Sequence, residues 1–421
     1  MKRTFRGGVV FPAALRDKKE TALASSFLPI LPKQLHLSLR QRNTELEPTV
    51  AVGDTIRIGE PLAVDPTGTI PPLHCGISGT VTAIERSLAT LDGIPATVIT
   101  VTNDGSHTFG SLLPPLPENA SRDALIQRMY DAGLVGMGGA GFPTHRKYQT
   151  DTVRHLLINA CECEPYLAGD VRLCIEQADT LTEGIRLFAA AAGIPLREAV
   201  FCTESPAAAA RLSGLGVRTV LLRGRYPQGS ERQLIAAVFG REIPGGCFPA
   251  DCGFLVSNSA TAIAMAEAAH GLPLTHRSVT VSGEVARPVN LLAPIGTPIS
   301  DLIELAAPLV SGRRCRYIAG GPMTGTRIAT LAAGLPKTCG GITVLPAHRT
   351  KESACIRCGG CVRVCPAGLM PFRIEAAYLA GERDDTATAC ISCGCCSYVC
   401  PAKRNLAAHI GKARSEMRQR S

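Results

Sequence analysis

Nine of the 18 cysteines lie in two short runs toward the C-terminal end of the sequence. The first run, CIRCGGCVRVCP, begins at Cys355, and the second, CISCGCCSYVCP, begins at Cys390. Each contains the spacing C-x2-C-x2-C-x3-C-P, with which a polypeptide holds a [4Fe–4S] cluster through thiolates. Three thiolates within seven residues reach one cluster, and the fourth, followed by proline, ligates the other. The two runs therefore predict two cubane clusters.

The ligand sets are expected to interleave between the runs. They are Cys355, Cys358, Cys361 and Cys400 for one cluster, and Cys390, Cys393, Cys396 and Cys365 for the other. Zinc sites usually consist of separated C-x2-C pairs, and disulfide frameworks belong to small secreted domains. Neither alternative explains two tandem runs that each close with Cys-Pro. Four further cysteines match no ligand pattern: Cys247, Cys252, Cys315 and Cys339.

A second candidate site is a glycine-rich segment, GMGGAGFPTHRK. Gly136, Gly138 and Gly141 match G-x-G-x-x-G, and Gly139 is an additional glycine. This motif normally follows a strand, whereas a helix is expected to precede it here. Backbone without side chains can approach a phosphate or a ring system closely, its N–H groups can bind anions, and Lys147 supplies a nearby cation. The alternative is a glycine-rich turn that packs tightly against a neighbour.

A third candidate is the end of the next apolar strand, INACECEP. Asn159, Glu162 and Glu164 follow this strand, where open α/β sheets bind ligands. Carboxylates there can accept hydrogen bonds from ribose hydroxyls or from a carboxamide. Cys161 and Cys163 are expected to be small buried thiols, because a C-x-C disulfide is strained.

Length and composition limit the class of protein. A chain of 421 residues is expected to form two to four domains. The absence of Trp and an aromatic content of 4% argue against a stacking platform for nucleic acid. The net charge of +9 is spread out except in the tail from Lys403 to Arg420. That tail is either a solvated amphipathic helix or a contact with an anionic lipid or protein surface.

Cysteine content and hydropathy indicate the compartment. Abundant cysteine without a signal peptide indicates a reducing compartment, so we expect a cytoplasmic protein. No run of ~18 uncharged apolar residues is present, so no membrane-spanning helix is expected. The alanine-rich stretch 257–274 contains Glu267 and is more plausibly a buried helix.

Four segments are expected to position these residues, giving a multidomain α/β and β fold. Residues 1–115 contain short alternating strands typical of the barrel-sandwich fold of biotinyl and lipoyl carriers. Such carriers need a lysine at a hairpin tip, where this chain has His74-Cys75, so a structural or docking role is expected; two adjacent ligands are a weak metal signal. Residues 116–275 alternate helices and apolar strands, which indicates an α/β domain with a largely parallel sheet.

The remaining two segments complete this division. Residues 276–330 indicate a hairpin and a helix, and resemble the small β-grasp domain that binds soluble ligands, of the SLBB kind. Residues 331–421 are expected to form a helical, bacterial-ferredoxin-like domain for both clusters, with the basic tail.

These segments together resemble one family over nearly the whole chain. The matching segments are FRGG, GLVGMGGAGFPTHRK, INACECEPYL, RYPQGSERQLI, GGPMTG and both cysteine runs with SYVCPAKR. They resemble the C subunit of the Rnf complex, a membrane-bound, ion-translocating ferredoxin:NAD oxidoreductase. The central part is also similar to the flavoprotein subunit of respiratory complex I, whose glycine loop and acidic strand bind FMN and NADH.

The resemblance implies roles for individual residues. It implies that the residues cradling FMN are Gly136, Gly138, Gly139, Gly141 and Lys147, with Asn159 and Glu162 facing the flavin. It places Glu164, Phe142 and Glu231 toward the dinucleotide, and Tyr226, Gly229 and Asn258 at further flavin-side positions. Glu162 and Glu164 are thus the candidate catalytic residues. The chain departs from complex I at Met137, where that family has arginine, and at Cys161 and Cys163, which replace aspartate and serine.

The resemblance also implies an activity and partners. The expected function is electron transfer between NAD(H) and a partner through FMN and two [4Fe–4S] clusters. The partners would be the membrane subunits of an Rnf-type complex, with the chain peripheral on the cytoplasmic face. The alternatives are a soluble NADH-dependent reductase serving a corrinoid or amino-acid reductase enzyme, and a cluster-only electron relay.

Overall fold

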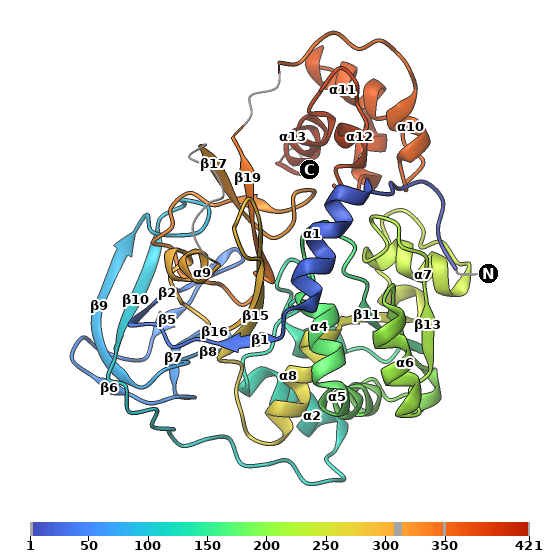
Figure 1. Ribbon diagram of the computed structural model, residues 1–421. Coiled ribbons are helices and arrows are strands. Elements are labelled where there is room, and N and C mark those ends of the chain that lie inside the picture. Colours follow the sequence, from blue (N-terminus) through green and yellow to red (C-terminus); the bar gives the residue numbers. More distant parts are fainter. Residues whose placement is uncertain (1–2, 307–313, 348–350, 420–421) are drawn as a thin grey trace.

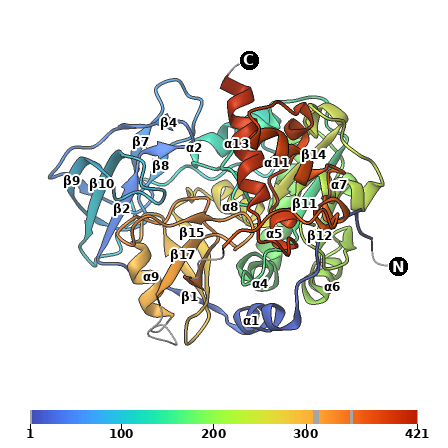
Figure 2. The ribbon, with the colours of Figure 1, turned by 90° about the horizontal axis from the view of Figure 1, so that it is seen from above.

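The computed structural model describes residues 3–306, 314–347 and 351–419. In Figure 1 a strand-rich region (blue) lies beside the α/β region (green), and a helical C-terminal region (red) stands above the latter. Seen from above in Figure 2, this C-terminal region covers β11, β12 and β14 and leaves the blue strands uncovered. The predicted cluster region is therefore placed against the α/β region.

The N-terminal strand-rich region consists of small antiparallel sheets. One has the order β2-β10-β9-β6 and another the order β5-β7-β8, beside a β3–β4 hairpin. Their bounds are β2 Gln34–Ser38, β3 Arg40–Gln41, β4 Thr44–Glu45, β5 Glu47–Pro48, β6 Thr55–Ile56, β7 Pro61–Val64, β8 Leu73–His74, β9 Gly79–Ser87 and β10 Ala96–Asn103. His74 and Cys75 are buried, and the Cys75 thiol donates to the Ile77 carbonyl at 3.1 Å. The stretch that replaces a carrier lysine is thus packed inside the region.

The α/β region contains a four-stranded parallel sheet of order β13-β12-β11-β14. Its strands are β11 His155–Ala160, β12 Ala199–Thr203, β13 Thr219–Leu221 and β14 Phe254–Asn258. Its helices are α2 Arg122–Asp131, α3 Thr144–Tyr148, α4 Gly169–Glu176, α5 Ala178–Ala191, α6 Pro206–Gly214, α7 Glu231–Phe239 and α8 Ser259–Ala269, with short 3-10 turns at Leu196–Glu198 and Ala250–Cys252. The β12 strand is buried at every residue, because helices cover both faces of a parallel sheet. Ser121 caps α2 by accepting from the Ala124 amide at 3.2 Å, as its position predicts.

A third region is a six-stranded sheet of order β1-β16-β15-β19-β17-β18. Its elements are β1 Phe27–Pro29, β15 His276–Gly283, β16 Val289–Pro294, β17 Cys315–Ala319, β18 Thr326–Arg327 and β19 Gly341–Pro346, with α1 Ala13–Ala24 and α9 Ile299–Leu305 packed beside it. The sheet thus includes β1 from the predicted first segment and β19 from the predicted fourth segment. The predicted boundary at residues 330 and 331 therefore falls inside a sheet, since pairing between distant strands leaves no local signal.

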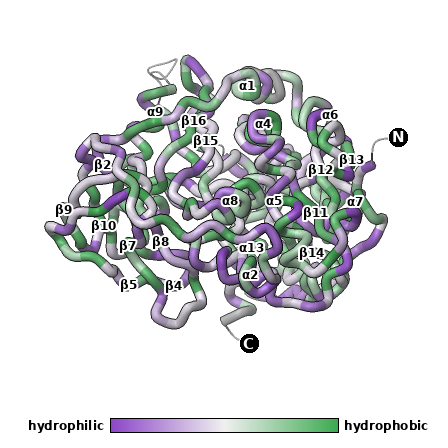
Figure 3. The backbone as a smooth tube through the Cα atoms, turned by 90° about the horizontal axis from the view of Figure 1, so that it is seen from below, coloured by the Kyte–Doolittle hydropathy of each residue, from purple (hydrophilic) through white to green (hydrophobic). Residues whose placement is uncertain are grey.

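The C-terminal region is helical. It comprises α10 Gly360–Val364, α11 Pro371–Leu379, a 3-10 turn Asp385–Ala389, α12 Cys395–Tyr398 and α13 Leu406–Gln419. Leu369, Ile374, Ala387 and Ile410 form its small core. Most of the predicted basic tail lies on α13, and Arg420 lies outside the described residues. No helix in the described residues is long and apolar enough to cross a membrane, and hydrophilic stretches interrupt hydrophobic ones along the tube in Figure 3.

Candidate functional site

The eight predicted cluster ligands gather around two separate hollows. The outer cysteine group lines one of them and consists of Cys355, Cys358, Cys361 and Cys400. The inner cysteine group lines the other, together with Cys395, and consists of Cys365, Cys390, Cys393 and Cys396. Each hollow contains about 370 Å³ of empty space, part of which is open to solvent. These are the two sets that the spacing predicts.

The donor chemistry of both groups suits a cubane. Among the described residues no three His, Cys, Asp or Glu side chains stand close enough to hold a single metal ion. A cubane places its irons at separate corners, so each thiolate binds a different atom and the four sulfurs stand further apart. Each group places four thiols around one hollow, and four thiolates are the ligand set of a [4Fe–4S] cluster.

The inner group is the more buried of the two. Burial raises the pKa of Cys365 and Cys390, and raises that of Cys396 to about 12. A hydrogen bond with the Cys395 thiol lowers the pKa of Cys393 to about 7. Cys355 and Cys358 of the outer group are instead exposed. Binding to a metal ion deprotonates a thiol. Iron would therefore stabilise the thiolates of the inner group, which burial alone disfavours.

The inner group contacts the end of the acidic strand. The Tyr226 hydroxyl donates to the Cys393 carbonyl at 2.8 Å. Close by, the Gly229 amide donates to the Cys163 sulfur at 3.3 Å. Cys163, Tyr226 and Cys395 belong to one small hydrophobic cluster, and burial raises the pKa of Tyr226, which keeps its hydroxyl protonated as a donor. The two candidate sites are therefore adjacent in space.

The glycine loop lies between α2 and α3, beside the end of β14. A Cβ at Gly138 would stand 2.8 Å from Asn258 Nδ2, and one at Gly141, whose φ is +64°, would stand 2.7 Å from Thr338 Cγ2. Gly138 and Gly139 are both exposed, whereas Gly141 is buried. The loop follows α2, as the sequence predicts, and it precedes the short α3. It approaches Asn258 closely because it carries no side chains there.

Polar side chains connect the strand ends into a network. Asn159 Nδ2 donates to the Gly229 carbonyl at 2.8 Å, and Asn258 Nδ2 donates to the Asp170 carboxylate at 2.7 Å. The Glu162 carboxylate accepts from the amides of Asp170 at 3.2 Å and Val171 at 3.3 Å. Glu162 thus lies at the N-terminus of α4, whose dipole favours a negative charge.

The charged candidates have partners within the protein. Lys147 Nζ donates to Glu231 Oε1 at 2.6 Å and to the Val256 carbonyl. The Glu164 carboxylate accepts from the Met323 amide at 3.0 Å, and from the Thr324 amide at 2.9 Å and hydroxyl at 2.7 Å. Glu164 therefore ties the strand end to the GGPMTG segment. Lys147 and Glu231 form an ion pair of their own beside β14.

Phe142 lies at the open side of the site. Its ring is 45% exposed, and the Arg42 guanidinium lies 5.3 Å from the ring centroid. Arg42 has a φ of 56° and belongs to the turn between β3 and β4. A hairpin of the N-terminal region therefore reaches the glycine loop.

Sequence reasoning misses several of these contributors. Asp170 links Asn258 to Arg277, because it accepts from Asn258 and lies 3.5 Å from the Arg277 guanidinium. A single aspartate near the start of a helix forms no motif that the sequence would reveal. Arg42 arrives from a distant hairpin without a local signal. The GGPMTG segment is recognisable as a family feature, and its amides prove to be the partners of Glu164.

Family models match four consecutive parts of the chain. Residues 3–106 match the RnfC barrel sandwich hybrid domain. Residues 129–267 match the Nuo51 FMN-binding domain, and residues 278–327 match the SLBB domain. Residues 349–404 match the 4Fe-4S dicluster domain. These matches confirm the predicted fold classes of the four segments.

Curated relatives match most of the chain. The C subunit of an ion-translocating oxidoreductase complex from Rhodobacter capsulatus is 36% identical over 377 residues, which are 85% of this chain and 72% of the relative. The C subunit of a Na(+)-translocating ferredoxin:NAD(+) oxidoreductase complex from Acetobacterium woodii is 35% identical over 395 residues, 88% of this chain and 86% of the relative. A C subunit from Pseudomonas aeruginosa is 36% identical over 90% of this chain, which spans 51% of that relative.

A solved structure shares the fold more distantly. An air-oxidised NAD+-reducing [NiFe]-hydrogenase matches with a TM-score of 0.50 and 23% identity, over 71% of this chain and 66% of that chain. This likeness concerns the fold alone.

Proposed function

The chain belongs to the RnfC family, the C subunits of ion-translocating oxidoreductase complexes, and we propose that it transfers electrons between NAD(H) and a protein partner with FMN and two [4Fe–4S] clusters. The observation that carries this proposal is the packing of the inner cysteine group against the acidic strand end at Cys163, with a hydrogen bond to Cys393 from Tyr226 in the loop between β13 and α7. When bound, FMN exchanges a hydride with a nicotinamide and single electrons with cubanes, which each take one. The protein supplies binding, orientation and electrostatics.

The glycine loop and the surrounding strand ends would hold FMN. The residues that we propose for this are Gly136, Gly138, Gly139, Gly141, Lys147, Asn159, Glu162, Tyr226, Gly229 and Asn258. The backbone amides of the loop suit an anionic phosphate. Lys147 would supply a positive charge to the phosphate in exchange for its bond to Glu231.

Three residues at the open side of the loop would orient the dinucleotide. The exposed Phe142 ring offers a flat apolar surface. Glu231 and Glu164 can accept hydrogen bonds from ribose hydroxyls or from a carboxamide. Glu231 is the more available of the two, because Glu164 already accepts from Met323 and Thr324.

The two cysteine groups would carry electrons away from this site in order. The inner group lies against the strand end, whereas the outer group exposes Cys355 and Cys358. The outer group is thus placed to face a partner. We propose that this partner is a membrane subunit of an Rnf-type complex, and that the chain is peripheral on the cytoplasmic face.

An anaerobic titration with NADH tests the proposal. The protein, reconstituted with iron, sulfide and FMN, is titrated while flavin absorbance and cluster EPR are recorded together. The expected result is bleaching of the flavin followed by a reduced-cluster signal. Clusters that dithionite reduces but NADH leaves unchanged would contradict it.

A further inference from the structure

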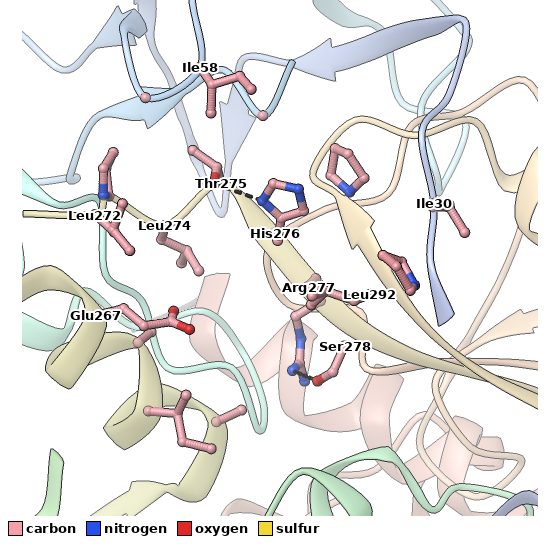
Figure 4. Close-up of a pocket in the computed structure, with 18 of the residues that line it drawn as sticks. Ile30, Ile58, Glu267, Leu272, Leu274, Thr275, His276, Arg277, Ser278 and Leu292 are labelled. Atoms are coloured by element: carbon pink, nitrogen blue, oxygen red, sulfur yellow. Dashed lines mark hydrogen bonds between the residues drawn. The ribbon is translucent and has the colours of Figure 1, made fainter. Parts of the chain in front are cut away.

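A cavity of about 600 Å³ lies apart from both cysteine groups. It is bounded by α8, by β15 and β16, and by loops of the N-terminal strand-rich region. Figure 4 shows Glu267 on α8 and His276 on β15 pointing toward the same space, with Ile58 and Leu292 on other sides. Its size and its position between regions are those of small-molecule sites.

Most of the cavity wall is apolar. Ile58, Ile263, Leu274 and Leu292 contribute to it. Four further lining residues are large hydrophobic side chains that remain exposed to solvent: Leu31, Phe109, Leu112 and Leu272. Exposed apolar side chains that cluster around one opening often mark a ligand-binding site.

A few polar groups line the same space. His276 Nδ1 is bonded to the Thr275 hydroxyl at 2.9 Å, and burial lowers the pKa of His276 to about 4. Burial raises the pKa of Glu267, which favours the neutral acid. Across the described residues, no group hydrogen-bonds to the Glu267 carboxyl. The imidazole is therefore neutral near pH 7, and the carboxyl has hydrogen-bonding capacity to offer.

The charge of the cation beside the cavity is paired with a carboxylate, although its buried Nε has no hydrogen-bond partner among the described residues. The Arg277 guanidinium lies 3.5 Å from Asp170 and donates to Ser278 at 2.8 Å and to the Met137 carbonyl at 3.1 Å. An anionic ligand would lie beside the Glu267 carboxyl and would find no unpaired positive charge in the cavity to stabilise it. A cationic ligand would lose its hydration among the apolar walls, which is unfavourable. Both considerations favour an uncharged ligand.

We propose that this cavity binds a neutral, predominantly apolar ring compound that presents a carbonyl oxygen to Glu267, the chemistry of a quinone head group. In its protonated form, which burial favours, the Glu267 carboxyl donates a hydrogen bond to that carbonyl, and the apolar walls enclose the rings. The site shares Met137 with the glycine loop and Arg277 with the Asp170 network. It does not depend on NAD(H) or on electron transfer.

Calorimetry on the anaerobic, oxidised holoprotein tests this inference. The probe is 2,3-dimethyl-1,4-naphthoquinone, whose substituted ring positions block addition of cysteine thiols, and 2,3-dimethylnaphthalene is the matched compound without carbonyls. We expect saturable binding of one quinone per chain, and binding of the hydrocarbon that is weaker by roughly three- to tenfold, the value of one hydrogen bond.

Variants locate the site. Glu267→Leu should weaken quinone binding by roughly three- to tenfold, whereas Glu267→Gln keeps a donor and should change it less. Leu272→Ala should weaken binding of both compounds. Leu196→Ala is the matched control, because Leu272 and Leu196 are 41% and 42% exposed and only the former lines the cavity.

Three results would overturn the proposal. No saturable binding of the quinone would remove the site, and equal affinity for the two compounds would remove the carbonyl preference. Binding that both Glu267→Leu and Leu272→Ala leave unchanged would place the ligand elsewhere. Unaltered flavin and cluster absorbance of each variant serves as the check that it is folded.

Discussion

The two cysteine groups have the same spacing and contrasting surroundings. Gly359 and Gly394 occupy the same place in the two runs, with φ values of 70° and 76°. A Cβ at Gly394 would meet the Met323 carbonyl at 2.9 Å, whereas one at Gly359 would meet only the end of the Arg363 side chain at 3.3 Å. The outer group also exposes Ile356 at 67%. The two groups thus have the same ligand chemistry, but the inner group packs against the rest of the protein and the outer group lies at the surface.

From this difference we infer that the two clusters would have different tasks. Tyr226 bonds to the inner group, and Met323 lies between Gly394 of that group and Glu164 of the candidate nucleotide site. Each group also takes one cysteine from the other run, because Cys365 lies with the inner group and Cys400 with the outer. We therefore expect packing, rather than the motif, to set the order of electron transfer.

Removing one ligand from each group should give the largest and most unequal effect. Cys393→Ala should lose about half of the iron and abolish NADH-dependent reduction of the remaining cluster, while dithionite still reduces it. Cys358→Ala should lose as much iron but keep NADH-dependent reduction of the inner cluster. Iron analysis and EPR measure both. Equal responses of the two variants to NADH would contradict the inner and outer assignment.

Breaking the shared scaffold should affect both groups alike. Glu375, 2% exposed, bonds Arg404 at 2.6 Å and His409 at 2.7 Å, and so joins α11 to the α13 region. Glu375→Leu leaves a charge unpaired and should cost about 3–5 kcal/mol of unfolding free energy. Glu375→Gln, which keeps hydrogen-bonding capacity, should cost less. Denaturant unfolding and iron loss report the effect, and loss of only one cluster would argue against a common scaffold.

Alanine variants of Gly359 and Gly394 test the contact between the inner group and Met323. Alanine at either position should cost about 1–2 kcal/mol because of the left-handed backbone. Gly394→Ala should cost about 1–3 kcal/mol more, since its Cβ displaces Met323. Only this variant should slow NADH-dependent cluster reduction in stopped-flow experiments. If Gly359→Ala slowed it equally, the Met323 contact would have no special role.

A single hydroxyl gives the smallest expected effect. Tyr226→Phe removes the bond to the Cys393 carbonyl and should cost about 0.5–1.5 kcal/mol of stability. The control is Tyr398→Phe, a residue 40% exposed that contacts Phe11 through its ring, with a change within about 0.5 kcal/mol. Thermal unfolding of the holoprotein distinguishes the two. A larger loss at Tyr398 would reverse the comparison.

The locally encoded features were predictable from the sequence. Both cysteine sets follow from spacing within short runs, and the helix before the glycine loop follows from the pattern around Ser121. The parallel sheet follows from alternation of apolar strands with helices. Each of these depends on neighbours within a few residues or on a repeated pattern.

Features made by distant partners were not predictable. The six-stranded sheet joins strands from residues 27–29, 276–294 and 341–346. A division of the chain into consecutive segments therefore splits this sheet between segments. Arg42 reaches Phe142, and Asp170 joins Asn258 to Arg277, through the fold alone. The cavity at Glu267 likewise needs three regions to enclose it. Their residue types carried no pattern that local reasoning could detect.

The central claim is that the inner cluster lies between the nucleotide site and the outer cluster. Rapid freeze-quench EPR after mixing the holoprotein with NADH tests it most directly, with each signal assigned from Cys393→Ala and Cys358→Ala. The account predicts that the inner cluster is reduced first and that the outer signal grows as the inner one transfers its electron. An outer signal that rises first, or at an unchanged rate in Cys393→Ala, would contradict it.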